Sequence, residues 1–78
     1  MPFKVGEMVR YEHPLSTDET QLSLYHYGRE HLDGKLALIL DVSSNSSDYF
    51  CFINGDRMWI NEAVLYEVKE NENKKKNS

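Results

Sequence analysis

The sequence predicts an all-β domain made of five short antiparallel strands. Three observations support this fold class. Short apolar segments recur along the chain, and most of them alternate apolar and polar residues with the period of two that is typical of strands. The pair Asn54-Gly55 separates two of these segments and is a strong hairpin signal. With 78 residues, the chain has room for one domain only.

The first predicted strand runs from Val5 to Tyr11. Val9 and Tyr11 share one face of this segment, whereas Met8 and Arg10 share the other. The strand ends before Pro14, because proline lacks the N–H that a ladder requires.

Residues 12–34 form a long first loop, since they show no sustained alternation. Ser16 followed by Glu19 is the pattern of a helix start, and a helix beginning there would reach about Tyr25 before Gly28 breaks it. Connections of this length in small domains are usually functional or mobile.

The next three strands are predicted over residues 35–42, 49–53 and 56–60. Residues 35–42 are apolar on both faces until Asp41, which indicates either a central strand or an outer face that meets a partner. Polar residues 43–48 form the first connection. Asn54-Gly55 forms the second, because a type I′ turn needs positive φ at both central positions.

The predicted domain closes with a single turn and a fifth strand. Residues 61–63 are long enough for one turn of 3₁₀ helix only, and residues 64–68 form the last short strand. Residues 69–78 contain no apolar side chain, so a disordered tail is expected there. The folded domain is therefore expected to span residues 1–68.

Four segments of the chain resemble a known group of proteins. They are residues 3–11 (FKVGEMVRY), 34–42 (GKLALILDV), 49–56 (YFCFINGD) and 59–68 (WINEAVLYEV). In this order they are similar to small SH3-like proteins of the KOW and Tudor type, which are common in bacteriophages. The resemblance implies a five-stranded SH3-like barrel with a long first loop. The third strand opens with Asp48-Tyr49 instead of a Trp pair, so the signature of domains that bind proline-rich peptides is missing.

The charge distribution favours a protein partner over nucleic acid. The net charge is −4, of which residues 1–68 carry −6 (5 Lys and Arg, 11 Asp and Glu) and residues 69–78 carry +2. An acidic domain repels a phosphate backbone, which basic side chains would have to neutralise. The basic residues Arg10, Arg29, Lys35 and Arg57 are too scattered along the sequence to predict a basic patch.

Cysteine usage and the start of the chain predict a cytoplasmic protein, in the host cytoplasm if a phage encodes it. Cys51 is the only cysteine, so no internal disulfide forms, and residues 1–4 do not begin a signal peptide. The longest apolar run, residues 36–40, is far too short to cross a membrane. His13, His26, His31 and Cys51 match no familiar metal-site spacing, so neither metal nor cofactor is expected.

The aromatic residues are the candidates for partner contact. Tyrosine is enriched at interfaces because its ring is apolar and its hydroxyl stays hydrated. Tyr25 and Tyr27, in the long loop, either fold over the end of the barrel or face a partner. Trp59 is either a core residue or a wall of a groove. The full candidate set is Tyr11, Tyr25, Tyr27, Tyr49 and Trp59.

We therefore expect a small non-enzymatic binding module whose partner is a protein. No nucleophile motif and no glycine-rich phosphate loop is present. Two alternatives stay open. One is a nucleic-acid-binding accessory protein of the KOW or Tudor type, and the other is a structural component of a larger assembly. Self-association is also compatible with the two apolar faces of residues 35–42.

Overall fold

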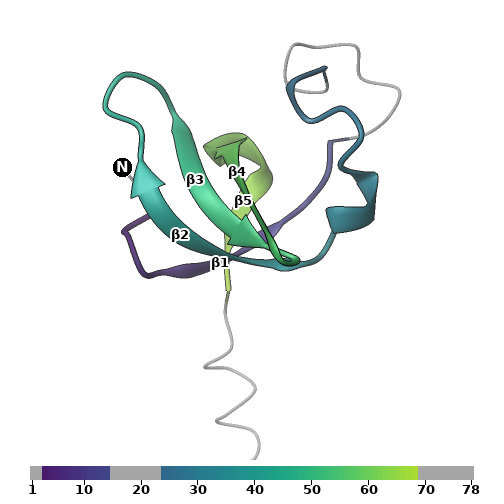
Figure 1. The fold of residues 1–78 in the computed structure, drawn as a ribbon, viewed down its shortest axis with the longest axis horizontal. Helices are drawn as coiled ribbons and strands as arrows, with labels where there is room; N and C mark the ends of the chain where they lie inside the picture. Colours follow the sequence, from purple (N-terminus) through teal and green to yellow (C-terminus); the bar gives the residue numbers. More distant parts are fainter. Residues whose placement is uncertain (1–2, 15–23, 69–78) are drawn as a thin grey trace, which may run out of the picture.

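The computed structural model describes residues 3–14 and 24–68, which form one curved antiparallel sheet (Figure 1). The strand order is β4-β3-β2-β1-β5, so β4 and β5 are the two edges and the ladder does not close into a barrel. The all-β prediction is confirmed. The predicted helix start at Ser16 and the predicted disordered tail 69–78 lie outside the described residues.

The five strands lie close to the predicted segments. They are β1 (Met8–Tyr11), β2 (Leu36–Val42), β3 (Asp48–Ile53), β4 (Asp56–Asn61) and β5 (Leu65–Glu67). The 3₁₀ turn expected between the last two strands is η2 (Glu62–Val64), and a second one, η1 (Glu30–Leu32), lies in the long loop. β1 starts later than predicted, because Val5 and Gly6 form a turn.

The β3–β4 hairpin turns as the sequence predicts. Asn54 has φ 53° and Gly55 has φ 84°, the positive values that a type I′ turn needs at both positions. The turn sets the register in which Phe50 lies opposite Trp59 and Phe52 opposite Arg57. The side chains that later form the functional site are therefore aligned by this two-residue turn.

β2 contains a bulge that the sequence did not predict. The register with β3 shifts between Ile39 and Asp41, which leaves Leu40 without a direct partner. Such a bulge bends its strand and increases the local twist. Before the bulge β2 has one buried face, formed by Ala37 and Ile39, whereas Leu36 on the other face is exposed.

The core lies on one side of the sheet. It combines residues from all five strands with Leu32 of η1, Val64 of η2 and Phe3 of the N-terminal segment. Alternation along the strands explains which strand residues are buried, because every second side chain points inward. The buried residues are Phe3, Val9, Tyr11, Leu32, Ala37, Ile39, Tyr49, Cys51, Ile53, Ile60, Val64 and Leu65.

Candidate functional site: a groove between the long loop and β4

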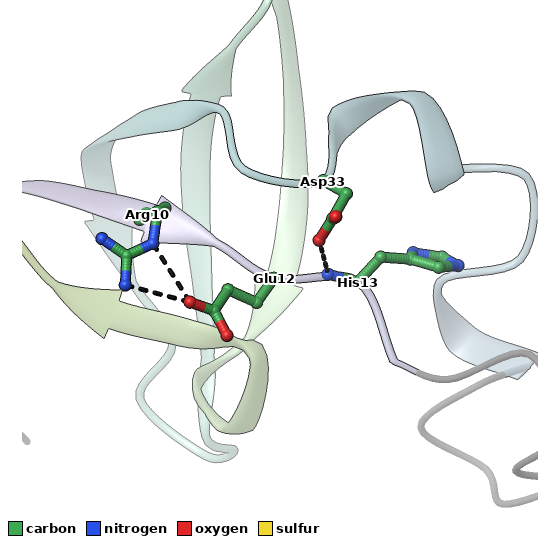
Figure 2. A network of polar contacts seen from close by, with 4 residues as sticks. All are labelled: Arg10, Glu12, His13 and Asp33. Atoms are coloured by element: carbon green, nitrogen blue, oxygen red, sulfur yellow. Dashed lines mark hydrogen bonds and ion pairs between the residues drawn. The ribbon is translucent and has the colours of Figure 1, made fainter.

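The two ends of the long loop are held together at its base. The Gly34 N–H donates to the Tyr11 carbonyl at 2.7 Å, and the Tyr11 N–H donates to the Lys35 carbonyl at 2.9 Å. Beside them, the His13 N–H donates to Asp33 Oδ1 at 2.9 Å (Figure 2). These bonds hold the point where the chain leaves the sheet, after Tyr11, beside the point where it returns, at Lys35.

Arg10, in β1, and Glu12, just after it, form an ion pair. The Arg10 Nε and Nη2 atoms both donate to Glu12 Oε2, at 3.1 and 2.9 Å (Figure 2). The two side chains are 40% and 44% exposed to water, so the pair contributes little to stability. Its consequence for function is that the Arg10 charge is neutralised locally.

His26 attaches the loop to β4. Its ring is completely buried, and its Nε2 atom accepts a hydrogen bond from the Asn61 N–H at 3.3 Å. The ring lies between Tyr11, with centroids 5.8 Å apart, and Tyr25, with centroids 4.6 Å apart. Because an imidazole nitrogen that accepts carries no proton, this contact requires a ring that is unprotonated at Nε2.

Arg29 makes a second attachment, three residues further along the loop. Its Nη1 atom donates to the Trp59 carbonyl at 2.9 Å. The same guanidinium lies over the Tyr25 ring, 5.7 Å from its centroid. Loop and strand are thus joined through a charged side chain that remains only partly buried.

The space between the loop, the 43–48 connection and the β3–β4 hairpin is an open groove of about 560 Å³. Its apolar floor includes the rings of Phe50 and Trp59, which contact each other at an interplanar angle of 44° with centroids 5.1 Å apart. This close contact follows from their cross-strand pairing. The residues that line the groove are Tyr25, Arg29, Ser43, Ser46, Asp48, Phe50, Arg57, Met58 and Trp59.

Polar groups of the groove are held in place by hydrogen bonds. Asp48 Oδ1 accepts from Asn61 Nδ2 at 3.1 Å, and Asp48 Oδ2 accepts from the Ser46 hydroxyl at 3.1 Å.

Partial burial raises the pKa of the Tyr25 hydroxyl, and the nearby Asp48 carboxylate raises it further while Arg29 lowers it. Asp48 is the one carboxylate among the lining residues, against the two cations Arg29 and Arg57. The groove is therefore cationic within an acidic domain.

The predicted contact residues fall into two groups. Tyr25 and Trp59, 41% and 39% exposed, line the groove, whereas Tyr27, 83% exposed, is on the loop and not among the lining residues. Tyr11 and Tyr49 have no exposed surface and belong to the core. Their placement on the contact surface is corrected accordingly, because their inward positions on β1 and β3 exclude contact with a partner.

The sequence also missed several lining residues. Arg29 and Arg57 were considered too scattered to act together, yet both line the groove. The position of Arg57 beside Trp59 could be predicted, because residues two apart in a strand share a face and both lie on the outer face of β4. Arg29 was not, since its position depends on the path of the long loop.

The described residues contain neither a metal-ligand cluster nor a thiol that is ionised at neutral pH. Among residues 3–14 and 24–68, no three His, Cys, Asp or Glu side chains gather in an arrangement that could hold a metal ion. Burial raises the pKa of the Cys51 thiol to about 12, so this thiol is protonated at neutral pH. The same residues include no helix with the length and apolar character needed to cross a membrane.

Truncation of His26 to alanine is expected to release the loop from β4. The Asn61 N–H loses its acceptor and the space between Tyr11 and Tyr25 empties, which should lower the free energy of unfolding by about 1–3 kcal/mol. Hydrogen exchange of residues 24–34 should become faster before the strands exchange. Tyr27→Ala, on the same loop but exposed, is the control. Unchanged loop exchange in His26→Ala would refute the attachment.

Comparisons with known proteins were made on three levels. No protein-family model, no curated protein and no solved structure matches this chain. The function of the groove therefore has to be inferred from its own residues.

Proposed function

We propose that this chain is a non-enzymatic binding module and that the groove between the long loop and β4 binds a protein partner. The observation that carries this proposal is the groove itself. It combines exposed aromatic side chains with hydrogen-bonding groups, and its loop wall is fixed to β4 by His26 and Arg29. Exposed aromatic residues and arginines on a fixed support are typical of protein interfaces.

We further propose that the curved sheet has an SH3-like architecture, with the ladder open between β4 and β5. Three features support this architecture: the strand order β4-β3-β2-β1-β5, the bulge in β2, and the 3₁₀ turn η2 between β4 and β5. In the described residues, the long loop and the 43–48 connection line one groove.

Trp59→Ala is expected to abolish most partner binding while leaving the fold intact. The indole is half exposed and its main packing contact is the Phe50 ring, so its loss should weaken a bound peptide at least tenfold at a moderate cost in stability. The measurement is selection of short random peptides on the wild-type chain, followed by titration of the selected peptides against each variant.

Met8→Ala is the matched control, because Met8 is comparably exposed but lies on β1 outside the groove. Equal weakening by the two substitutions would show that the groove is not the binding site. Failure to select any peptide on the correctly folded chain would overturn the protein-binding function itself.

A second candidate function is binding of single-stranded nucleic acid. It is favoured by one observation, namely that Arg29 and Arg57 line the same groove as three aromatic rings, a combination that suits phosphates and stacked bases. The net charge of −6 over residues 1–68 opposes it. An anisotropy titration with labelled oligothymidylate decides: binding that falls steeply with salt supports nucleic acid, and no binding at about 50 mM salt removes it.

A further inference from the structure

The free edge of β4 has an alternating pattern of backbone groups. The Glu62 N–H donates to the Ser47 carbonyl at 2.9 Å, which fixes the phase of the antiparallel ladder between β3 and β4. In such a ladder every second residue directs its N–H and C=O toward the neighbouring strand. Arg57, Trp59 and Asn61 are therefore the residues whose backbone groups point away from β3, at the edge of the sheet.

The long loop occupies one end of this edge. Its two side-chain bonds to β4 both go to outward-pointing backbone groups, because Arg29 donates to the Trp59 carbonyl and His26 accepts from the Asn61 N–H. These two bonds agree with the ladder phase, which supports the conclusion that the backbone groups of Trp59 and Asn61 point away from β3. At the other end, the N–H and C=O of Arg57 and the N–H of Trp59 also point outward, and they make no hydrogen bond with residues 3–14 or 24–68.

The side chains beside these groups define what can be added there. Arg57 and Trp59 lie two positions apart on the same face of β4, and both line the groove. The single ion pair within residues 3–14 and 24–68 joins Arg10 to Glu12, so Arg57 has no carboxylate partner in that part of the chain. The one carboxylate lining the groove, Asp48, is already bonded to Asn61 and Ser46.

We propose that the partner segment is an acidic, extended stretch of protein that pairs as an additional antiparallel strand with the edge of β4 at Arg57 and Trp59. This inference rests on the proposed protein-binding function and adds the mode of binding and the class of ligand. The added strand forms two backbone hydrogen bonds with Arg57 and one with the Trp59 N–H. Strand addition to an exposed edge is an established way for a sheet to bind a peptide.

The register of such a strand predicts a sequence pattern. In antiparallel pairing, the residue opposite Trp59 precedes the residue opposite Arg57 by two positions, and both side chains lie on the groove side. An apolar residue fits against the indole, and an Asp or Glu two positions later pairs with the unpartnered guanidinium. The pairing does not extend past Trp59 toward Asn61, because His26 and Arg29 occupy that part of the edge.

The test uses peptides selected on the full chain from a random library. We expect enrichment of the apolar-x-acidic pattern. In a selected peptide, N-methylation of the acidic residue removes an N–H that points at β4 and should weaken binding at least tenfold. N-methylation of the residue before it changes an N–H that points away, and should alter binding less than threefold. Arg57→Glu should weaken the same peptide about tenfold, and a peptide with Lys at the acidic position should recover binding to this variant.

Each result has a definite meaning. Selected peptides that tolerate both N-methylations equally, or that show no acidic preference, would overturn strand addition while the proposed binding function stands. No selected peptide at all would overturn the proposed function, and the inference with it. If oligothymidylate displaced a bound peptide at a lower concentration than the same unlabelled peptide does, the two arginines would be assigned to phosphate contacts. That result would overturn the acidic-peptide inference.

Discussion

Replacing Tyr49 with alanine is expected to lower the free energy of unfolding by about 3–5 kcal/mol. The Tyr49 side chain is completely buried in β3, and its ring meets Phe3 edge to face with centroids 5.4 Å apart. Its hydroxyl also accepts the Phe3 N–H at 3.4 Å. A single core of this size rarely supplies more than about 3–5 kcal/mol, so the variant should be mostly unfolded in buffer at 25 °C.

The measurement is urea unfolding followed by Trp59 fluorescence and by circular dichroism. Tyr49→Phe keeps the ring and removes only the hydroxyl, so its expected loss of about 1 kcal/mol is measurable even if the alanine variant does not fold. Tyr27→Ala, at a residue 83% exposed, should change stability by less than about 0.5 kcal/mol. A stable, fully folded Tyr49→Ala variant would show that Tyr49 is not a core residue.

The strands were predictable because their signals are local. Alternation within a few residues, and the pair Asn54-Gly55, determine which segments extend and where the chain turns back. The bulge at Leu40 was not predictable, because residues 36–40 are apolar at every position and offer no alternation whose interruption could be noticed. Local pattern therefore gave the order of the strands but not the curvature of the sheet.

The same alternation could have removed two residues from the candidate site. Tyr11 shares a face with Val9, and Tyr49 shares one with Cys51, and each of those neighbours is buried. The places of the two tyrosines at strand ends near the long loop favour a shared aromatic surface, but their positions within the strands direct both side chains inward. Strand parity is thus a stronger predictor of burial than residue type for an amphipathic side chain.

The composition of the groove depends on contacts that no local pattern contains. Arg29 reaches the Trp59 carbonyl from 30 residues away, and Asn61 reaches His26 from 35 residues away. Both bonds require the path of the long loop over the end of β4. The net charge of −6 over residues 1–68 concealed a cationic groove for the same reason, since a sum over the sequence says nothing about which charges meet.

The domain is expected to lose stability steeply in alkaline solution. Burial raises the pKa of the Cys51 thiol from 9.0 to about 12 and that of the Tyr11 hydroxyl from 10.0 to about 12, against an opposing effect of Arg29 on both. A group whose pKa is higher in the folded state binds its proton more tightly there. The stabilisation is therefore complete below pH 9 for Cys51 and below pH 10 for Tyr11, and it is lost as the pH rises toward 12.

The full loss, reached only near pH 12, is at most about 7 kcal/mol for the two groups together, since each unit of pKa difference corresponds to about 1.4 kcal/mol. Cys51 ionises first in the unfolded chain, so the decline between pH 9 and 10 should come mainly from its thiol. Urea midpoints measured across pH 8 to 11 should therefore fall more gradually in Cys51→Ala than in the wild type. Cys51→Ala combined with Tyr11→Phe should flatten the curve further above pH 10.

The comparison relies on slopes because the substitutions also change packing. Cys51→Ala removes a buried sulfur and Tyr11→Phe removes a hydroxyl that lies 2.6 Å from His13 Nδ1, and both losses apply at every pH. Repulsion among the acidic residues of the domain is also common to all the variants and cancels between them. Only the part of the unfolding free energy that is linked to proton binding by Cys51 and Tyr11 makes the slopes of the variants differ. Parallel curves for the wild type and the double variant would show that neither group has a raised pKa in the folded protein.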